Sequence, residues 1–133
     1  MFITVTLLLF GLIDYHYFTH PVKLPFRELA NYVRTTRQEN DYLINWNSSS
    51  HHLWETKYYG FDSPIYVVEG VELPFFVGTA LMTTSDVVNN IPETASRVGV
   101  TTTGPIEEIE IEGYTETETE ILGDLKFVWL TKQ

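Results

Sequence analysis

The chain has no cysteine among its 133 residues. This absence excludes disulfide bonds, iron–sulfur clusters, thiolate zinc sites and cysteine nucleophiles, because each of them needs a cysteine sulfur. Positive charge is also scarce, since 18 acidic side chains outnumber 8 lysines and arginines and the formal net charge is -10. Nucleic-acid binding depends mainly on clustered lysine and arginine, so we expect no nucleic-acid partner.

The sequence also lacks the short patterns that mark many enzymes. Neither of the phosphate-binding patterns G-x-G-x-x-G and G-x-x-x-x-G-K-[ST] occurs, and the nucleophile pattern G-x-S-x-G is missing. The carboxylates between Ile106 and Glu120 alternate with other residues, which favours a solvated strand over an acid–base pair. We therefore predict no catalytic residue and no cofactor for this chain.

The most apolar part of the sequence is its first segment, Met1 to Ile13. It has no basic region of the kind that begins a secretory signal peptide. As a helix it would be about 20 Å long, which is less than the roughly 30 Å thickness of a hydrocarbon core. Two interpretations stay open: the β-branched residues 3–6 favour a buried strand, whereas the aromatic and polar residues 14–18 are typical of a helix that leaves a membrane.

Beyond this segment the pattern predicts alternating helices and strands. Phe26, Leu29, Ala30 and Val33 follow the i, i+3, i+4, i+7 repeat of an amphipathic helix after Pro25. The other expected elements are strands over 42–46, 64–68 and 97–103, a helix from the serine run 48–50 to about Tyr59 with a left-handed stop at Gly60, and a short helix over 85–92. Residues 73–82 are apolar throughout and fit either type.

The C-terminal part predicts a hairpin. Thr115 to Glu120 alternate threonine and glutamate, Gly123-Asp124 is a turn sequence, and residues 125–130 are apolar on both faces. With 44% hydrophobic residues the chain can form one core. We predict an α/β fold, a small three-layer Rossmann-like sheet with a C-terminal antiparallel hairpin, formed by residues 20–133 as a soluble domain after an apolar segment at 1–19.

The candidate binding residues lie in the run 45–60, NWNSSSHHLWETKYYG. On a helix, His51 and His52 each share a face with Glu55, which is four and three positions away. Zinc needs three or four protein ligands, and the pattern is not H-E-x-x-H. We therefore predict no metal site, and we expect one histidine to be exposed and the other to lie near the helix start.

Two other pairs in this run are candidates for ligand contacts. Ser48 and Ser49 precede the predicted helix, whose backbone N–H groups can bind a phosphate or carboxylate, although the absence of a nearby basic residue favours a simple capping role. Tyr58 and Tyr59 can form a stacking surface for a sugar or lipid, although aromatic residues at such spacings more often pack in a core.

Several segments, taken in order, resemble the C-terminal end of a family of membrane enzymes. They are the apolar segment with its aromatic exit, PFRELANYV at 25–33, DYLI at 41–44 and LWETKYYG at 53–60. The family is that of the dolichyl-phosphate-mannose protein mannosyltransferase-like glycosyltransferases, which includes the aminoarabinose transferases. Its members transfer a sugar from a polyprenyl-phosphate carrier to an acceptor, using acidic residues in an early extracytoplasmic loop. Nothing in this chain corresponds to that loop, so no catalytic position carries over.

The resemblance implies a non-catalytic, extracytoplasmic C-terminal domain or fragment of such an enzyme, with residues 2–13 as the end of its last membrane helix. Its expected partners are the membrane or the remaining transmembrane part, together with a lipid-linked sugar or an acceptor. The alternative is a standalone acidic soluble module for interaction or small-ligand binding, in which Ile3 to Leu9 form a core strand. A Rossmann-like enzyme, the third option, lacks any fingerprint.

Overall fold

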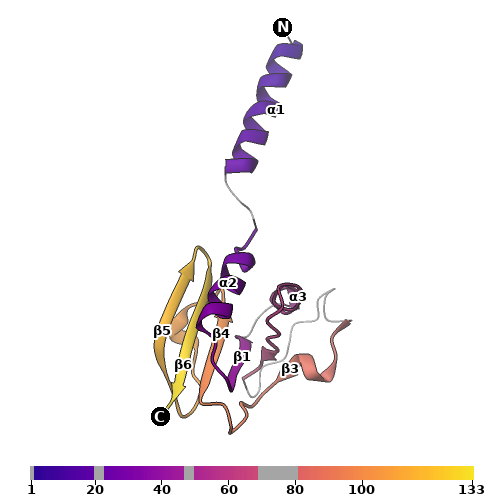
Figure 1. Cartoon of the computed structure of the whole chain (residues 1–133). Helices are drawn as coiled ribbons and strands as arrows, with labels where there is room; N and C mark the ends of the chain where they lie inside the picture. Colours follow the sequence, from indigo (N-terminus) through magenta and orange to yellow (C-terminus); the bar gives the residue numbers. More distant parts are fainter. Residues whose placement is uncertain (1, 20–22, 47–49, 69–80) are drawn as a thin grey trace.

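The computed structural model describes residues 2–19, 23–46, 50–68 and 81–133, with the side chains of Phe2, Ser50 and His51 excepted (Figure 1). Within these ranges the helices are α1 (Phe2–Thr19), α2 (Phe26–Thr36) and α3 (Ser50–Tyr58). The strands are β1 (Asp41–Trp46), β2 (Ile65–Tyr66), β3 (Val87–Val88), β4 (Arg97–Thr102), β5 (Tyr114–Leu122) and β6 (Leu125–Lys132). Two short 3-10 helices, η2 (Thr84–Asp86) and η3 (Ile106–Glu108), complete the set.

The six strands form one mixed sheet in the order β3-β2-β1-β4-β6-β5. Strand β1 pairs in parallel with β2 and β4, and β2 pairs in parallel with β3. Strand β6 is antiparallel to both β4 and β5. The predicted α/β class and the C-terminal antiparallel hairpin are therefore confirmed.

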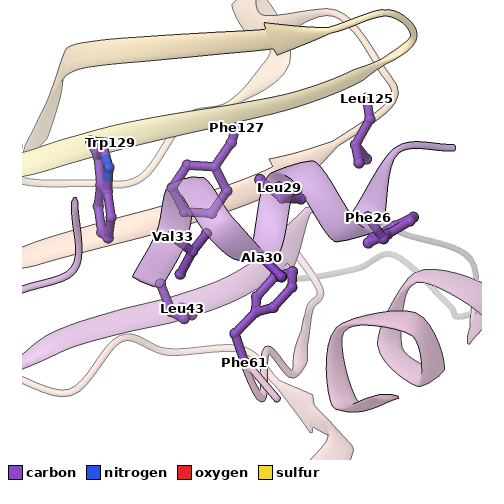
Figure 2. Close-up of a cluster of buried hydrophobic side chains, with 9 residues drawn as sticks. All are labelled: Phe26, Leu29, Ala30, Val33, Leu43, Phe61, Leu125, Phe127 and Trp129. Atoms are coloured by element: carbon purple, nitrogen blue, oxygen red, sulfur yellow. The ribbon is translucent and has the colours of Figure 1, made fainter. Parts of the chain in front are cut away.

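Helix α2 covers one face of the sheet. Its predicted apolar stripe, Phe26, Leu29, Ala30 and Val33, is buried in full, and Pro25 occupies the N-cap position just before the first turn. Figure 2 shows this stripe beside side chains of β1 and β6. The complete cluster is Phe26, Leu29, Ala30, Val33, Leu43, Phe61, Leu125, Phe127 and Trp129. Each large side chain in it stabilises the fold by about 1.5–3 kcal/mol relative to exposure.

A second core lies on the opposite face, because successive strand residues point to opposite sides of a sheet. It contains Ile44 of β1, Val128 of β6 and their neighbours, and the segment around η3 covers it with Ile106, Ile109 and Ile111. The sheet is thus covered on one side by helices and on the other mainly by a loop segment.

The hairpin follows its sequence pattern closely. Strand β6 lies inside the sheet, between β4 and β5, which explains why it is apolar on both faces. Strand β5 is an edge strand whose glutamates are mostly exposed, with a register irregularity between Glu116 and Glu118. Gly123 has φ +64 in the turn, a conformation that favours glycine.

Two predicted elements are wrong. The strand proposed over Ile3 to Leu9 is part of helix α1. The helix predicted over 85–92 is only the 3-10 turn η2, after which Val87 and Val88 extend as β3 beside β2. Thr83, two residues before the predicted start, is the N-cap and forms a capping box with Asp86, but the β-branched valines then favour a strand. The apolar run 73–82 lies largely outside the described residues.

Helix α1 stands apart from the sheet and its helices (Figure 1). Its apolar side chains are exposed, for example Ile3 at 77%, Leu7 at 68% and Phe10 at 61%. Among the described residues, neither buried cluster includes a side chain from α1. No helix in the described ranges has the length and apolar character that crossing a membrane requires.

Candidate functional site

The structure describes the side chains of only some of the predicted site residues. Ser48 and Ser49 lie outside the described residues, and His51 is described only as part of the α3 backbone. His52 is 7% exposed and its ring centroid is 5.6 Å from that of Phe26, so this histidine packs between α3 and α2. In the described part of the chain no three His, Cys, Asp or Glu residues are grouped to hold a metal ion.

The two tyrosines at the end of α3 differ in exposure. Tyr58 is 82% exposed, whereas Tyr59 is half-buried against the cluster under α2. Their ring centroids are 5.0 Å apart and the rings are nearly perpendicular, at 88°. Gly60 has φ +79, and the Phe61 N–H then donates to the Thr56 carbonyl, which ends the helix as the sequence predicts.

Tyr59 lines a cavity of about 690 Å³ at the start of α2, which we call the α2 cavity. Its wall comes from three parts of the chain: the residues that begin α2, the end of α3, and the turn between β5 and β6. The lining consists of apolar Leu24, Pro25, Tyr59 and Leu122, of Gly123, and of charged Lys23, Arg27, Glu28 and Asp124. The cavity thus combines an apolar wall with charged groups of both signs.

The cations of the α2 cavity, Lys23 and Arg27, form no ion pair with another described residue that would compete with a ligand. In the described part of the chain the ion pairs are Lys57–Asp86 and Arg97–Asp41, and neither involves Lys23 or Arg27. Both cavity cations are exposed. Residues 20–37 contain four of the eight basic side chains but only one of the 18 acidic ones. Positive charge is therefore concentrated around α2 in an otherwise acidic chain.

A second feature lies at the carboxyl ends of the central parallel strands. Asn45 of β1 and Thr101 of β4 are register partners, and both are fully buried. Asn45 Nδ2 donates to the Ser63 carbonyl at 2.7 Å, but among the described residues Asn45 Oδ1 and Thr101 Oγ1 have no hydrogen-bond partner. Buried polar atoms of this kind are the groups that an internal water bridges. None of the described cavities reaches this pair.

A smaller cavity of about 430 Å³ lies over the other face of the sheet. Its apolar side is formed by Tyr66, Ile91, Ile111 and Tyr114. Tyr114 donates from its hydroxyl to the Ala95 carbonyl at 2.7 Å, and burial raises the pKa of this tyrosine. Lys132 Nζ donates to the Glu93 carbonyl at 3.0 Å. These polar groups already have partners in the protein, so the α2 cavity is the stronger candidate.

The ion pair between Lys57 of α3 and Asp86 of η2 joins two elements that are far apart in the sequence, since the two residues are 29 positions apart. Asp86 is buried and its Oδ2 also accepts from the Thr83 N–H at 2.8 Å and the Thr83 hydroxyl at 2.9 Å. Burial works to raise the pKa of Asp86, but the bonds from Lys57 and Thr83 outweigh it and hold the pKa below its ordinary value of 3.8.

We expect Asp86→Asn to destabilise the protein in a pH-dependent way. Because the pKa of Asp86 is lower in the folded state, its stabilisation is complete above about pH 3.8 and is lost as the pH falls through the folded value. The variant should lose about 1–3 kcal/mol of unfolding free energy at pH 7, the scale of hydrogen bonds to a charged group. Urea unfolding at pH 7 and pH 3 measures the difference, and an equal loss at both would contradict it.

Comparison with known proteins leaves function to be inferred from geometry. No family model, curated protein or solved structure matches the chain. The described residues offer an exposed apolar helix and, four positions after its end, the first residue of a cavity with an apolar wall and two cations. This combination is suited to binding at an apolar–polar boundary.

Proposed function

We propose that this chain is a non-catalytic α/β domain that a membrane glycosyltransferase carries on its extracytoplasmic side, with α1 buried in the membrane or against the transmembrane part of the enzyme. Such an enzyme transfers sugar from a polyprenyl-phosphate carrier. The domain's role is structural, and the α2 cavity gives it a place to take part in substrate recognition. The observation that carries the proposal is the exposure of α1.

The exposed apolar surface of α1 surrounds the helix. The consecutive residues 7–10, LLLF, occupy a full helical turn, and each is more than half exposed. A helix that is hydrophobic all round is normally buried in a core or in a membrane. The exposed large aliphatic and aromatic side chains of residues 3–13 are Ile3, Val5, Leu7, Leu8, Leu9, Phe10, Leu12 and Ile13. At about 1.5–3 kcal/mol each, leaving them in water costs on the order of 10 kcal/mol.

The end of α1 has the composition of a membrane interface. Tyr15, Tyr17 and Phe18 follow the apolar residues, and Tyr17 and Phe18 form an edge-to-face pair with centroids 5.8 Å apart. Tyrosines gather at headgroup level, where an apolar ring body and a polar hydroxyl are both satisfied. This placement supports α1 entering the bilayer with its C-terminal end at the surface.

The glycosyltransferase part of the proposal rests on the family resemblance. The resembling segments PFRELANYV, DYLI and LWETKYYG form most of α2, the start of β1 and most of α3, and each has a residue in or against the cluster in Figure 2: the apolar stripe of α2, Leu43 of β1, and Tyr59 just after α3. The segments are therefore neighbours in space as well as in sequence. Their shared packing supports one structural unit following an apolar helix, as the resemblance implies.

Removing α1 tests the proposal. We expect the full chain to stay with membranes through carbonate extraction, and residues 20–133 to be a folded soluble monomer by gel filtration and circular dichroism, because both buried clusters lie in that part. A matched control keeps the full length but carries Leu8→Lys and Leu12→Lys, each of which costs about 3 kcal/mol in a membrane centre. This control should be released from membranes.

Three results would overturn the proposal. If residues 20–133 unfold, α1 belongs to the core. If the full chain is a soluble monomer, the alternative of a standalone acidic interaction or small-ligand module is favoured. If the purified chain transfers sugar from a polyprenyl-phosphate donor, it is catalytic.

A further inference from the structure

We propose that the α2 cavity binds the headgroup of a zwitterionic phospholipid with a primary ammonium group, of the phosphoethanolamine type, at the surface of the membrane that holds α1. This inference rests on the proposed function, because it needs α1 in the membrane. In the proposed complex Lys23 and Arg27 bind the phosphate, and Glu28 and Asp124 bind the ammonium group.

The chain itself limits how far the cavity can lie from the membrane surface. Lys23, the first residue of its lining, follows Thr19 at the end of α1 by only four positions. Four residues span at most about 14 Å, at about 3.3–3.6 Å per residue. The headgroup layer of a bilayer is itself roughly 5–8 Å thick on each side. The cavity is therefore within reach of lipid headgroups whenever the aromatic end of α1 lies at the interface.

The arrangement of the elements also places the α2 cavity at the end of the sheet nearest α1. The start of α2 and the turn between β5 and β6 lie at the end of the sheet from which the chain leads to α1 (Figure 1). Both elements line the α2 cavity. Ile121 beside the turn is 62% exposed, and Tyr58 next to Tyr59 is exposed as well. Exposed aromatic and aliphatic side chains around a charged site are typical of a surface that contacts a bilayer.

The lining matches the two halves of such a headgroup. Arginine can hold a phosphate through two parallel N–H bonds, and lysine adds a compact positive charge. Glu28 and Asp124 place carboxylates in the same cavity, so its four charged side chains balance to zero, although the whole chain carries -10. A neutral pair of opposite charges complements phosphate plus ammonium better than a phosphate alone. A primary ammonium can donate hydrogen bonds to both carboxylates, which a quaternary ammonium cannot.

The apolar part of the cavity suits the rest of the lipid. Leu24, Tyr59 and Leu122 are half-buried and continue the core under α2 to the cavity wall. Its volume of about 690 Å³ lies within the roughly 300–1,000 Å³ of small-molecule sites. A glycerol backbone and the first carbons of an acyl chain can therefore contact this wall while the headgroup meets the charged rim.

Vesicle partitioning of the full chain tests the inference. We expect at least fivefold tighter binding to phosphatidylcholine vesicles that contain phosphatidylethanolamine than to phosphatidylcholine alone. The variant Glu28→Gln/Asp124→Asn should reduce this preference to less than twofold, because these carboxylates contact the ammonium group by which the two lipids differ. The variant Lys23→Gln/Arg27→Gln should weaken binding to both kinds of vesicle, because both lipids carry the phosphate. The matched control Arg34→Gln/Arg37→Gln removes two cations from the far end of the same helix and should keep the preference.

Each contrary result has a separate meaning. Absence of the full chain from phosphatidylcholine vesicles would reject the proposed function, since α1 would not enter the bilayer. Normal binding to phosphatidylcholine with no preference, or a preference that survives in Glu28→Gln/Asp124→Asn, would reject the headgroup site alone. Stronger binding to phosphatidylglycerol than to phosphatidylethanolamine, independent of Glu28 and Asp124, would replace the zwitterionic ligand by an anionic one and overturn the inference.

Discussion

Replacing Gly99 with valine is expected to remove about 3 kcal/mol or more of the free energy of unfolding, a large part of the stability of a domain this size. Gly99 lies in β4 under the cluster of Figure 2, and a Cβ atom at this position would be 2.5 Å from Phe127 Cζ, 2.7 Å from Leu43 Cδ2 and 2.8 Å from Trp129 Cζ3. Adding methylenes to a packed core commonly costs about 1–3 kcal/mol, and three buried carbons against two aromatic rings should reach or exceed the upper end. Total stabilities of small domains are only about 5–15 kcal/mol.

Urea unfolding followed by tryptophan fluorescence measures this effect. Gly99→Ala should show a smaller loss than Gly99→Val, because only one carbon is added. Gly104→Ala is the matched control, since the nearest atom to its Cβ would be Thr102 Oγ1 at 3.4 Å, and we expect a change below about 1 kcal/mol. Equal stabilities for Gly99→Ala and Gly104→Ala would show that the rings move aside easily.

We expect Arg97→Met to cost about 3–5 kcal/mol, the usual penalty for removing one partner of a buried ion pair. Arg97 donates from Nε and Nη2 to the Asp41 carboxylate, at 3.1 and 2.7 Å, and the Asp41 side chain is only 1% exposed. Arg97 Nη2 also donates to the Thr36 carbonyl at 2.6 Å, and its guanidinium lies 3.9 Å from the Trp129 ring centroid. Methionine keeps much of the contact with the ring but leaves the carboxylate unpaired.

The double variant Asp41→Asn/Arg97→Met separates the charge from the packing. Its loss of unfolding free energy should be smaller than the sum of the losses of the two single variants, because neither an unpaired carboxylate nor an unpaired guanidinium remains. Arg34→Met, on the exposed side of α2, should change the unfolding free energy by no more than about 0.5 kcal/mol. If Arg97→Met stays within 1 kcal/mol of the wild type, Asp41 must be satisfied by other groups such as the Gln38 N–H.

The elements that the sequence predicts well are those in which one physical signal dominates. Helix α2 has an uninterrupted apolar stripe, and all four predicted residues are buried. The β5–β6 hairpin combines a Gly-Asp turn with one polar and one apolar strand, and both strands appear at the expected place in the sheet. In each case local pattern and tertiary packing favour the same structure.

The structures of the first segment and of the region after β2 are harder to predict from the sequence, for a physical reason. The apolar side chains of α1 surround the helix, so they have no periodicity that separates a helix from a buried strand. Strands β2 and β3 have two residues each, and tertiary pairing rather than local pattern defines them. A strand of two residues is too short to show the alternation of apolar and polar residues by which a strand is recognised in a sequence.

The α2 cavity could not be read from the sequence. Lys23 and Asp124 are about 100 positions apart and line the same cavity only because the hairpin turn folds back beside the start of α2. Among the described side chains of the residues predicted for binding, Tyr59 lines this cavity. The concentration of basic residues between 20 and 37 was the available signal.

The position of β6 also determines the order of events during synthesis. Strand β6, which lies between β4 and β5 with Phe127 and Trp129 in the core, follows both in the sequence, so until the ribosome has passed residue 132 β5 lacks its sheet partner and β4 can pair only with β1. At about 5–20 residues per second, roughly 5–20 s separate the synthesis of α1 from that of β6. Under the proposed function, α1 therefore enters the membrane before the sheet closes, and the sheet folds on a chain that is already tethered.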